Sequence, residues 1–460
     1  MPINKLLIAN RGEIAVRIIR AAQALGIPTV AACSEADVAS LPAQLADEYR
    51  IIGAARADQS YLNPQAVLQA ARESGADAIH PGYGFLSENA AFAAAVGEAG
   101  MIFVGPTAAV IRSMGDKAAA RRTAQAAGVP VVPGSEQDIT TLDDALQAAE
   151  RIGYPLLIKA AAGGGGRGIR IVPSKEALQA AFPLAQQEAK AAFGSGQVYL
   201  ELFIEHARHI EVQILGDGER VVHLFDRECS LQRRRQKLFE EAPSPALTDT
   251  QRQALCDSAV KLAQSLSYQG AGTLEYLFDS ATGRFYFIEM NTRIQVEHPV
   301  TEMVTGVDLV QWMLRIAGGE KLTLRQEAIA LNGSACEMRI NAEDPERNFF
   351  PCPGTVTDVN WPQGAGVRIE SHLFAGYRIP PYYDSLVAKL VIHGEDRAQA
   401  LSRAAAALAD LRISGITTTQ SLHQWLLADS RLQAADFTTT ALERWLAERA
   451  AADAAAAQEI

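Results

Sequence analysis

Hydrophobic and polar positions in the first hundred residues alternate between short apolar runs and amphipathic helical stretches. Residues 5–10, KLLIAN, predict a strand. Residues 13–26 predict a helix with Ile14, Ile18, Ala22 and Leu25 on one stripe. Four further apolar runs, TVAAC, YRII, DAIHP and MIFVG, follow with helical segments between most of them. This rhythm predicts an α/β chain that begins with a doubly wound parallel sheet. The first turn, ANRGE, lacks the G-x-G-x-x-G pattern, which argues against dinucleotide binding.

From about Asp116 the pattern changes to strands joined by hairpins. A helical segment reaches Gly128, the linker GVPVVPGS follows, and YPLLIKA and GIRIV predict two strands joined by the loop AAGGGGRG. After a long helical stretch, QVYLELFI, HIEVQIL and VVHLFDREC predict consecutive strands, the last two joined by a GDGER turn. GTLEYLF and RFYFIEM predict another hairpin around DSATG. From about Gly333 the chain has a mixed α/β pattern that ends in an alanine-rich helix.

Length, charge and cysteine usage narrow the class of protein. A chain of 460 residues is long enough for two to four domains, and its formal charge of −11 argues against nonspecific nucleic-acid binding. The 5 cysteines are scattered and form no C-x-x-C, so we expect neither a disulfide framework nor a thiolate zinc site, which fits a reducing cytoplasm. No apolar run approaches the roughly 18 residues that span a bilayer. We therefore expect a cytoplasmic protein without membrane or nucleic-acid partners.

The strand RFYFIEM continues into a polar segment with hydrogen-bonding side chains at alternate positions. If the strand continues, these side chains point to one face. Such a face either meets water or forms a reaction site in which opposite charges surround a bound ion or anion. The five positions are Glu289, Asn291, Arg293, Gln295 and Glu297.

The hairpin around DSATG brings two carboxylates together. If Asp279 faces Phe285 across the turn, Glu275 falls opposite Glu289, and like charges so placed are unfavourable. A divalent cation removes the conflict. Two carboxylates with the Asn291 amide oxygen suit magnesium completed by nucleotide phosphates. The alternative is an exposed hairpin whose glutamates point into water.

Two further segments carry positive charge or free backbone N–H groups. The glycine loop at 163–168 lets N–H groups approach an anion, and Lys159 on the preceding strand would reach the same phosphates. A flexible connection between strands explains the loop alone about as well. The basic run Arg233, Arg234, Arg235 and Lys237 suits either a solvated face or, beside a nucleotide site, a polyphosphate and a small oxyanion.

Together these segments resemble the biotin carboxylase family of ATP-grasp ligases almost from end to end. The resemblance lies in IANRGEIAVRIIRA, HPGYGFLSENA, GDK, KAAAGGGGRGIR, RHIEVQ, EMNTRIQVEHPVTE, CEMRINAED and PPYYDSLVAKL. It implies an N-terminal domain over residues 1–115, an ATP-grasp core over 116–330 with a mobile lid at about 132–204, and a mixed α/β C-terminal domain over 331–446. An alanine-rich tail follows at 447–460.

The resemblance also implies how the nucleotide and its metal are held. Glu275, Glu289 and Asn291 would bind magnesium on ATP, and Lys117 and Lys159 would reach the nucleotide. Gly165 and Gly166 would cover the phosphates. The adenine-facing hinge would be Glu201, Leu202, Phe203 and Ile204, with His209, Gln232 and Arg235 near the ribose or the phosphates.

For the carboxylation chemistry, the resemblance implies that Lys237, Arg293, Gln295 and the backbone of Val296 bind bicarbonate. Glu297 would be the general base that removes the bicarbonate proton. Attack on the γ-phosphate would give carboxyphosphate, which decomposes to carbon dioxide and phosphate. Arg339 would stabilise the biotin enolate, and Tyr83 is a weaker candidate for the biotin side.

The chain departs from the family pattern at three positions and leaves several alternatives open. Arg235 stands where His is usual, Leu202 where Lys is usual, and Pro42 where Leu-His is common.

We expect a homodimer and, because no methionine adjoins a lysine, a stand-alone subunit that serves a separate biotin carboxyl carrier protein and carboxyltransferase. The acceptor is expected to be that of acetyl-CoA carboxylase in fatty acid biosynthesis, or another acyl-CoA, pyruvate or urea. A different ATP-grasp carboxylate–amine ligase and a weakened subunit kept for assembly are the rival functions.

Overall fold

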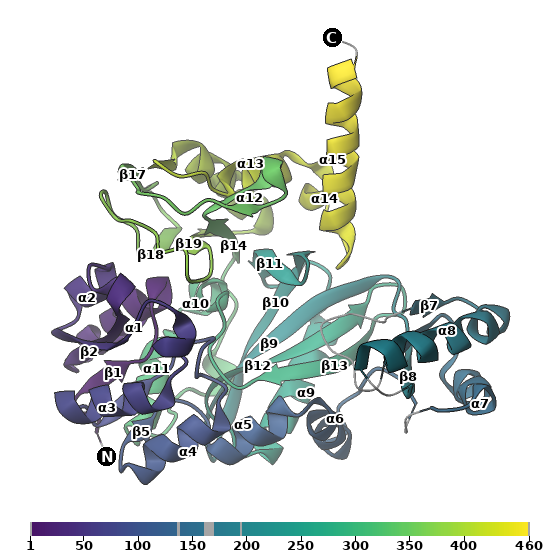
Figure 1. Ribbon diagram of the computed structural model, residues 1–460, viewed down its shortest axis with the longest axis horizontal. Coiled ribbons are helices and arrows are strands. Elements are labelled where there is room, and N and C mark those ends of the chain that lie inside the picture. Colours follow the sequence, from purple (N-terminus) through teal and green to yellow (C-terminus); the bar gives the residue numbers. More distant parts are fainter. Residues whose placement is uncertain (1, 136–138, 161–169, 194–195, 459–460) are drawn as a thin grey trace. The chain divides into compact units, whose positions relative to one another are not determined.

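The computed structural model describes residues 2–135, 139–160, 170–193 and 196–458 (Figure 1). The chain forms two compact units. The first comprises Met1–Val129, Arg208–Tyr276 and Glu289–Ile460, and the second comprises Pro130–Ala207 and Leu277–Ile288. The glycine loop named above, with Gly165 and Gly166, lies outside the described residues.

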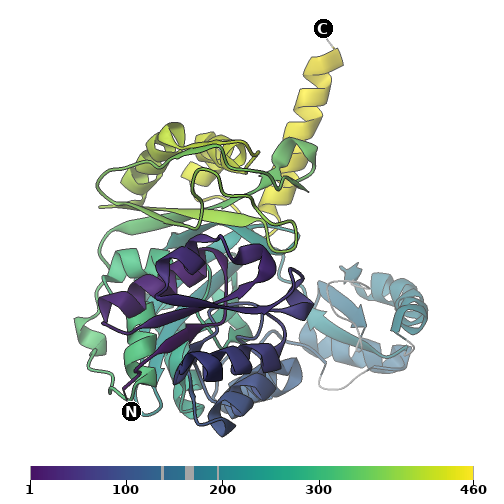
Figure 2. The ribbon, with the colours of Figure 1, turned by 60° about the vertical axis from the view of Figure 1, so that its left-hand side comes forward.

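The chain begins with a five-stranded sheet in the order β3-β2-β1-β4-β5, whose paired strands are all parallel. Helix α1 packs its apolar stripe on the face that carries Leu6 and Ile8, while α3 and α4 cover the opposite face around Leu7 (Figures 1 and 2). The predicted doubly wound sheet is therefore confirmed. The strands are β1 Leu6–Ile8, β2 Thr29–Ser34, β3 Glu48–Gly53, β4 Ala78–His80 and β5 Ile102–Phe103. The helices are α1 Gly12–Ala24, α2 Leu41–Leu45, α3 Pro64–Ser74, α4 Ala90–Glu98, α5 Ala108–Gly115 and α6 Lys117–Ala126.

An eight-stranded sheet in the order β13-β12-β9-β10-β11-β14-β19-β18 forms the centre of the fold. The predicted hairpins at 216–220 and 279–283 are present: β9 ends at Asp217, β12 ends at Asp279, and β10 and β13 begin just after each turn. The strands are β9 Ala207–Asp217, β10 Val221–Arg233, β11 Gln236–Ala242, β12 Gln269–Asp279, β13 Arg284–Asn291, β14 Ser334–Asn341, β18 Val367–Ser371 and β19 Leu386–Gly394. Helices α9 Asp249–Ser265, α10 His298–Thr305 and α11 Leu309–Ala317 accompany them.

The C-terminal part packs helices on the last strands of this sheet. Its core contains Met338, Ile340, Leu390 and the fully buried Trp445. The helices are α12 Arg397–Asp410, α13 Gln420–Ala428, α14 Ser430–Gln433 and α15 Ala441–Gln458, and α15 carries the alanine-rich end of the chain (Figure 2). The short strand pairs are β15 Glu343–Asp344 with β16 Phe350–Pro351, and β17 Asp358–Asn360 with β20 Arg412–Ser414.

The second unit has its own small antiparallel sheet in the order β7-β6-β8. Two helices pack on this sheet and bury Leu178 and Phe182 with the strand residues Leu156 and Ile158. The elements are α7 Leu142–Ile152, β6 Leu156–Ala160, β7 Arg170–Val172, α8 Lys175–Phe193 and β8 Val198–Leu202. Among the described residues of both units, no helix is long and apolar enough to cross a membrane.

Candidate active site

Lys237 on β11 is the centre of a buried charge cluster in the first unit. Its ammonium group lies 2.5 Å from Glu211 on β9, 3.0 Å from Glu275 on β12 and 2.7 Å from Glu297 at the start of α10. Burial alone would lower the pKa of Lys237, but the three carboxylates together raise it well above its usual value. Lys237 is therefore a permanent cation that holds three anions from three different elements.

A second cation, Arg227 on β10, supports the cluster from inside the protein. Its side chain is fully buried, and its Nε donates to Glu211 at 2.5 Å. The remaining donors bind Gln213 at 2.8 Å, Thr301 at 2.9 Å and Thr273 at 3.1 Å. The guanidinium charge is thus both paired and hydrogen-bonded, which burial of a charge requires.

Arg339 on β14 contacts the other oxygen of Glu297. One terminal nitrogen donates to Glu297 Oε2 at 2.8 Å, and Nε donates to Glu240 at 2.6 Å. The backbone carbonyl of Arg339 is bound in turn by Thr419 and His423 at 2.8 Å. Glu297 therefore lies between two cations, and although burial works against its charged form, these cations keep its pKa below its usual value. At neutral pH it is a carboxylate, able to accept a proton.

Arg293 contacts two other predicted residues of the site, Asn291 and Gln295. Its Nε donates to Glu88 at 2.9 Å, and its terminal nitrogens donate to Gln295 at 2.7 Å and to Asn291 at 3.0 Å. Asn291 and Gln295 each donate in turn to Glu275, at 2.8 and 3.1 Å. The structure therefore brings this predicted group together with the cluster around Lys237.

The expectation that a single strand carries all five polar positions is wrong. Strand β13 ends at Asn291, the residues after it have no strand structure, and Glu297 is the N-terminal cap residue of α10. Proline at position 299 suits the first turn of that helix, where no backbone N–H is needed. The side chains of Arg293, Gln295 and Glu297 reach the site because the chain turns there.

The carbonyl oxygen of Val296 accepts a hydrogen bond from Lys389 on β19 at 2.8 Å. Lys389 is fully buried and pairs with Glu13 of α1 at 3.1 Å. Tyr83, the candidate for the biotin side, donates its hydroxyl to the same Glu13. Tyr83 is therefore linked to the Val296 carbonyl through Glu13 and Lys389.

The proposed magnesium ligands supply hard oxygen atoms from neighbouring strands. Glu275 is held on β12 by the donors described above, and Glu289 on β13 lies 3.5 Å from the Lys117 ammonium group. The Glu289 side chain is 37% exposed, so its carboxylate is accessible to an incoming ion. A set of carboxylate oxygens with an amide oxygen from Asn291 fits Mg²⁺.

Two tighter groups of His, Cys and Glu side chains lie within the charge cluster, one with His209 and one with Cys229. His209 lies 3.1 Å from Glu275 and 3.8 Å from Glu211, and while burial opposes its charge, Glu275 raises its pKa to about 9. Cys229 also lies near Glu211, but burial raises the pKa of its thiol well above the usual value, so it remains neutral.

The hairpin between β10 and β11 positions two of the nucleotide candidates. Gln232 is directly opposite Lys237, and its amide donates to the Cys229 carbonyl at 2.8 Å. Arg234 and Arg235 form the exposed turn, with φ of 49° and 67°. Both residues thus have the left-handed conformation of a two-residue hairpin turn, in which Asn, Asp and His are enriched over Arg.

The predicted hinge lies in the second unit. Lys159 on β6 forms an ion pair with Glu201 on β8. The backbone N–H groups of Leu202 and Phe203 donate to carbonyl groups of two prolines within the same unit, at 2.8 and 2.9 Å. The Leu202 side chain packs on the small apolar cluster that contains Ile204, so a leucine is accommodated there by packing.

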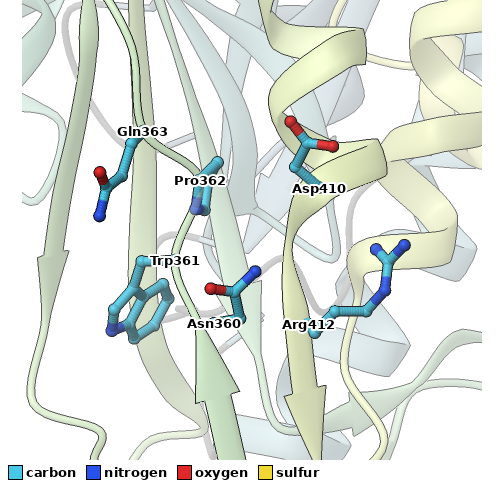
Figure 3. Close-up of a pocket in the computed structure, with 6 residues that line it drawn as sticks. All are labelled: Asn360, Trp361, Pro362, Gln363, Asp410 and Arg412. Atoms are coloured by element: carbon cyan, nitrogen blue, oxygen red, sulfur yellow. The ribbon is translucent and has the colours of Figure 1, made fainter.

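A surface pocket of about 440 Å³ lies elsewhere in the first unit (Figure 3). Its lining contains none of the predicted site residues. The segment Asn360, Trp361, Pro362 and Gln363 lines it together with Asp410 and Arg412.

Several charged residues of the site were missed from the sequence. Glu211 lies two residues after His209 on β9, and Glu337 lies two residues before Arg339 on β14. The period-two alternation that drew attention to residues 289–297 would therefore have identified both. Glu240 has no comparable signal, because two adjacent glutamates in a short strand do not reveal which one faces the site.

The fold and the cluster together define an ATP-grasp type of enzyme, and comparison with known proteins identifies its family. The biotin carboxylase N-terminal domain model matches residues 2–111, the model of the carbamoyl-phosphate synthase L chain ATP-binding domain matches 116–325, and the biotin carboxylase C-terminal domain model matches 337–444. The chain is 53% identical to a biotin carboxylase of Nostoc sp. over 96% of its own length and 98% of that protein. It is 53% identical to a biotin carboxylase of Pseudomonas aeruginosa over 93% and 95%.

Solved structures give the same result. The biotin carboxylase domain of a thermophilic 2-oxoglutarate carboxylase, bound to bicarbonate, matches with a TM-score of 0.92 and 46% identity over 96% of this chain and 98% of that one. The biotin carboxylase subunit of a pyruvate carboxylase matches with a TM-score of 0.89 and 49% identity over the same shares. The chain belongs to the biotin carboxylase family, and the predicted activity, ATP-dependent carboxylation of biotin, is the activity of that family.

The charged state of His209 predicts how stability depends on pH. Because its pKa is raised to about 9 in the folded protein, its contribution is complete below the unfolded value and is lost as the pH rises through the folded value. We expect His209→Gln to lower the melting temperature by several degrees at about pH 6, and the difference from wild type to shrink by about pH 9.5.

His80→Gln is the matched control, because burial lowers the pKa of His80 to about 3 and the ring is neutral over this range. Its effect on the melting temperature should be constant between the two pH values. A constant difference for His209→Gln as well would contradict the charged imidazole.

Proposed function

We propose that the cluster around Lys237 carries out the carboxylation of biotin with ATP and bicarbonate. The observation that carries this proposal is the position of Glu297, whose two carboxylate oxygens lie 2.7 Å from Lys237 and 2.8 Å from Arg339. A base held between two cations can receive a small anion, remove its proton and remain next to the groups that stabilise the resulting charge.

Bicarbonate would bind to Lys237, Arg293, Gln295 and the backbone of Val296. Arg293 is already fixed by Glu88 and Gln295, so its donors are oriented before the anion arrives. When bicarbonate binds to Lys237, the ammonium group interacts less strongly with Glu297, and the pKa of Glu297 is then depressed less. Its basicity toward the bicarbonate proton then rises at the moment of use.

Proton removal leaves a carbonate oxygen that attacks the γ-phosphorus of ATP, and the bond from that phosphorus to the ADP oxygen breaks. The product is carboxyphosphate. Glu275, Glu289 and Asn291 would hold Mg²⁺, which neutralises phosphate charge during the transfer. Lys117, next to Glu289, would contact the same phosphates.

Carboxyphosphate decomposes to carbon dioxide and phosphate, and the phosphate accepts the ureido proton of biotin. The enolate oxygen formed on biotin would lie at Arg339, whose planar guanidinium is permanently charged. The ureido nitrogen then bonds to the carbon of carbon dioxide. Tyr83 would contribute to the biotin side.

Further nucleotide contacts are proposed from the family resemblance. His209 and Gln232 would lie near the ribose, and Arg235 near the ribose or the phosphates. In the second unit, Lys159 and the segment 201–204 would bind the nucleotide, and Leu202 would contribute through its backbone. The roles of Gly165 and Gly166 fall outside the described residues.

The proposal also covers the oligomeric state and the partner proteins. One solved relative, the biotin carboxylase domain of the Hydrogenobacter thermophilus 2-oxoglutarate carboxylase, is a dimer in complex with MgADP, ADP and bicarbonate. We propose a cytoplasmic homodimer that carboxylates biotin on a separate carrier protein and serves a separate carboxyltransferase. Relatives carry the names of 2-oxoglutarate and pyruvate carboxylases, so acetyl-CoA is one acceptor among several to test.

Turnover measurements test this function directly. We expect the purified protein to hydrolyse ATP in the presence of Mg²⁺ only when bicarbonate is supplied, and free biotin to increase the rate. Release of ADP, measured with and without bicarbonate and with and without biotin, checks the expectation. Equal rates in bicarbonate-free buffer would contradict it, and a rate that depends on another carboxylic acid would indicate a carboxylate–amine ligase.

Removal of one proposed metal ligand tests the magnesium site. We expect Glu289→Gln to raise the Mg²⁺ concentration for half-maximal activity by about tenfold or more, because one carboxylate charge is lost. The melting temperature should change little, since an exposed pair such as Glu289 with Lys117 contributes about 1 kcal/mol at most.

Glu346→Gln is the matched control, because Glu346 is an exposed carboxylate paired with Arg449 at 2.6 Å. Its magnesium dependence should equal that of wild type. Unchanged magnesium dependence in Glu289→Gln would remove Glu289 from the metal site.

A further inference from the structure

Strands β11 and β14 place two glutamates directly opposite each other behind Arg339. Glu240 and Glu337 are Cα partners in the antiparallel register of these strands, so their side chains project to the same face. Both residues have 0% exposure. Two ionised carboxylates in these positions would repel each other strongly in an environment without water.

The hydrogen bonds of this pair are incomplete. Glu240 accepts from Arg339 Nε at 2.6 Å through one oxygen. The other oxygen of Glu240 and both oxygens of Glu337 are buried, and no donor among the described residues lies within hydrogen-bond distance of them. Unpartnered buried carboxylate oxygens are costly, and a proton held between the two side chains removes both this cost and the repulsion.

The neighbouring cations do not neutralise Glu337. Lys389, directly opposite Arg339 on β19, directs its ammonium group to Glu13 at 3.1 Å and to the Val296 carbonyl at 2.8 Å. The other titratable or charged groups around the pair are Arg339 on β14, Glu297 at the start of α10, Lys237 on β11 and Cys229 on β10.

The buried surroundings therefore favour the protonated form of these two glutamates. Burial raises the pKa of Glu337 well above its usual value and raises the pKa of Glu240 to about 7. Arg339 favours the charged form of Glu240, its direct partner, and no such contact exists for Glu337 among the described residues. The proton thus belongs mainly to Glu337.

We propose that Glu240 and Glu337 share one proton in the resting protein and act together as the positioning device for Arg339. The Glu240 carboxylate fixes Nε of the guanidinium, and the acid form of Glu337 keeps that carboxylate buried without adding a second negative charge. The inference rests on the proposed function, because Arg339 acquires its catalytic role there.

The two contacts that hold Arg339 explain why one added or lost proton on the glutamate pair would change the activity. Arg339 is held at two points, Glu240 on Nε and Glu297 on a terminal nitrogen at 2.8 Å, so its planar fork has one orientation. Loss of the shared proton at high pH places a second anion beside Arg339 and changes the field that orients it. Gain of a second proton at low pH removes the ionic partner of Nε. Activity should fall in both directions.

Three variants test this inference. Glu240→Gln removes the carboxylate that fixes Arg339, and Glu241→Gln is its matched control. Glu241 is adjacent on β11, equally buried and ion-paired, but with Arg397 at 2.6 Å on the other side of the strand. Glu337→Gln replaces the acid O–H by an amide N–H of similar shape.

We expect Glu240→Gln to lower kcat of the biotin-dependent reaction by about tenfold or more, with the KM for ATP changed less than about threefold. Glu241→Gln should keep kcat within about threefold, whatever its effect on the melting temperature. Glu337→Gln should keep most of kcat near neutral pH and lose the decline of activity at high pH that wild type shows.

A spectroscopic measurement on the ligand-free protein needs no activity. Infrared difference spectra of wild type against Glu337→Gln should contain the carbonyl stretching band of a protonated carboxylic acid, present only in wild type and shifted in D₂O. The band should be retained in Glu241→Gln.

Absence of this band from the difference spectrum, or equal kcat losses for Glu240→Gln and Glu241→Gln, would overturn the inference. A wild-type protein without bicarbonate-dependent ATP turnover would instead overturn the proposed function. In that case the band would still decide whether the pair holds a proton. If Glu240→Gln does not fold, Glu337→Gln and the spectra still give a decision.

Discussion

The ion pairs of Lys237 are the interaction on which the rest of the site depends. One ammonium group joins Glu211, Glu275 and Glu297, which come from β9, β12 and the start of α10. Burying these charges costs free energy, and only close pairing with complete hydrogen bonding offsets that cost. Arg227 provides a further cation for Glu211, and Arg339 provides one for Glu297.

This constraint relates the fold to the chemistry. Successive side chains of a strand point to opposite faces of the sheet. A shift of one residue in the register of β11 would therefore turn Lys237 away from all three carboxylates. The ion pairs that allow the cluster to be buried also keep Glu297 ionised and next to cations. The groups that the proposed reaction needs are therefore already charged and oriented before substrate binds.

Much of the fold followed from local patterns in the sequence. The parallel sheet of the first hundred residues and the hairpins at 216–220 and 279–283 were predicted from apolar periodicity and turn residues, and the structure confirms them. Residues 289–297 were predicted to share one strand, which was wrong because β13 ends at Asn291 and a helix begins at His298. Gln295 still donates to Glu275, and Arg293 donates to Gln295, because the turn after β13 directs both side chains into the site.

The partners of the supporting charges could not be predicted in the same way. Arg227 is fully buried, and its four partners lie on β9, β12 and α10, so its role depends on strand order and not on neighbours in the chain. Glu240 and Glu337 are nearly a hundred positions apart, and only the pairing of β11 with β14 brings them opposite each other. Long-range pairing of this kind has no local signal in one sequence.

The transfer of oxygen from bicarbonate to phosphate is the most direct measurement of the central claim. If a bicarbonate oxygen attacks the γ-phosphorus, that oxygen remains bonded to phosphorus when carboxyphosphate decomposes. With ¹⁸O-labelled bicarbonate and unlabelled water, we expect one labelled oxygen in each phosphate molecule released, as read by mass spectrometry. Phosphate without the label would contradict the account, because it would mean that water, and not bicarbonate, attacks ATP.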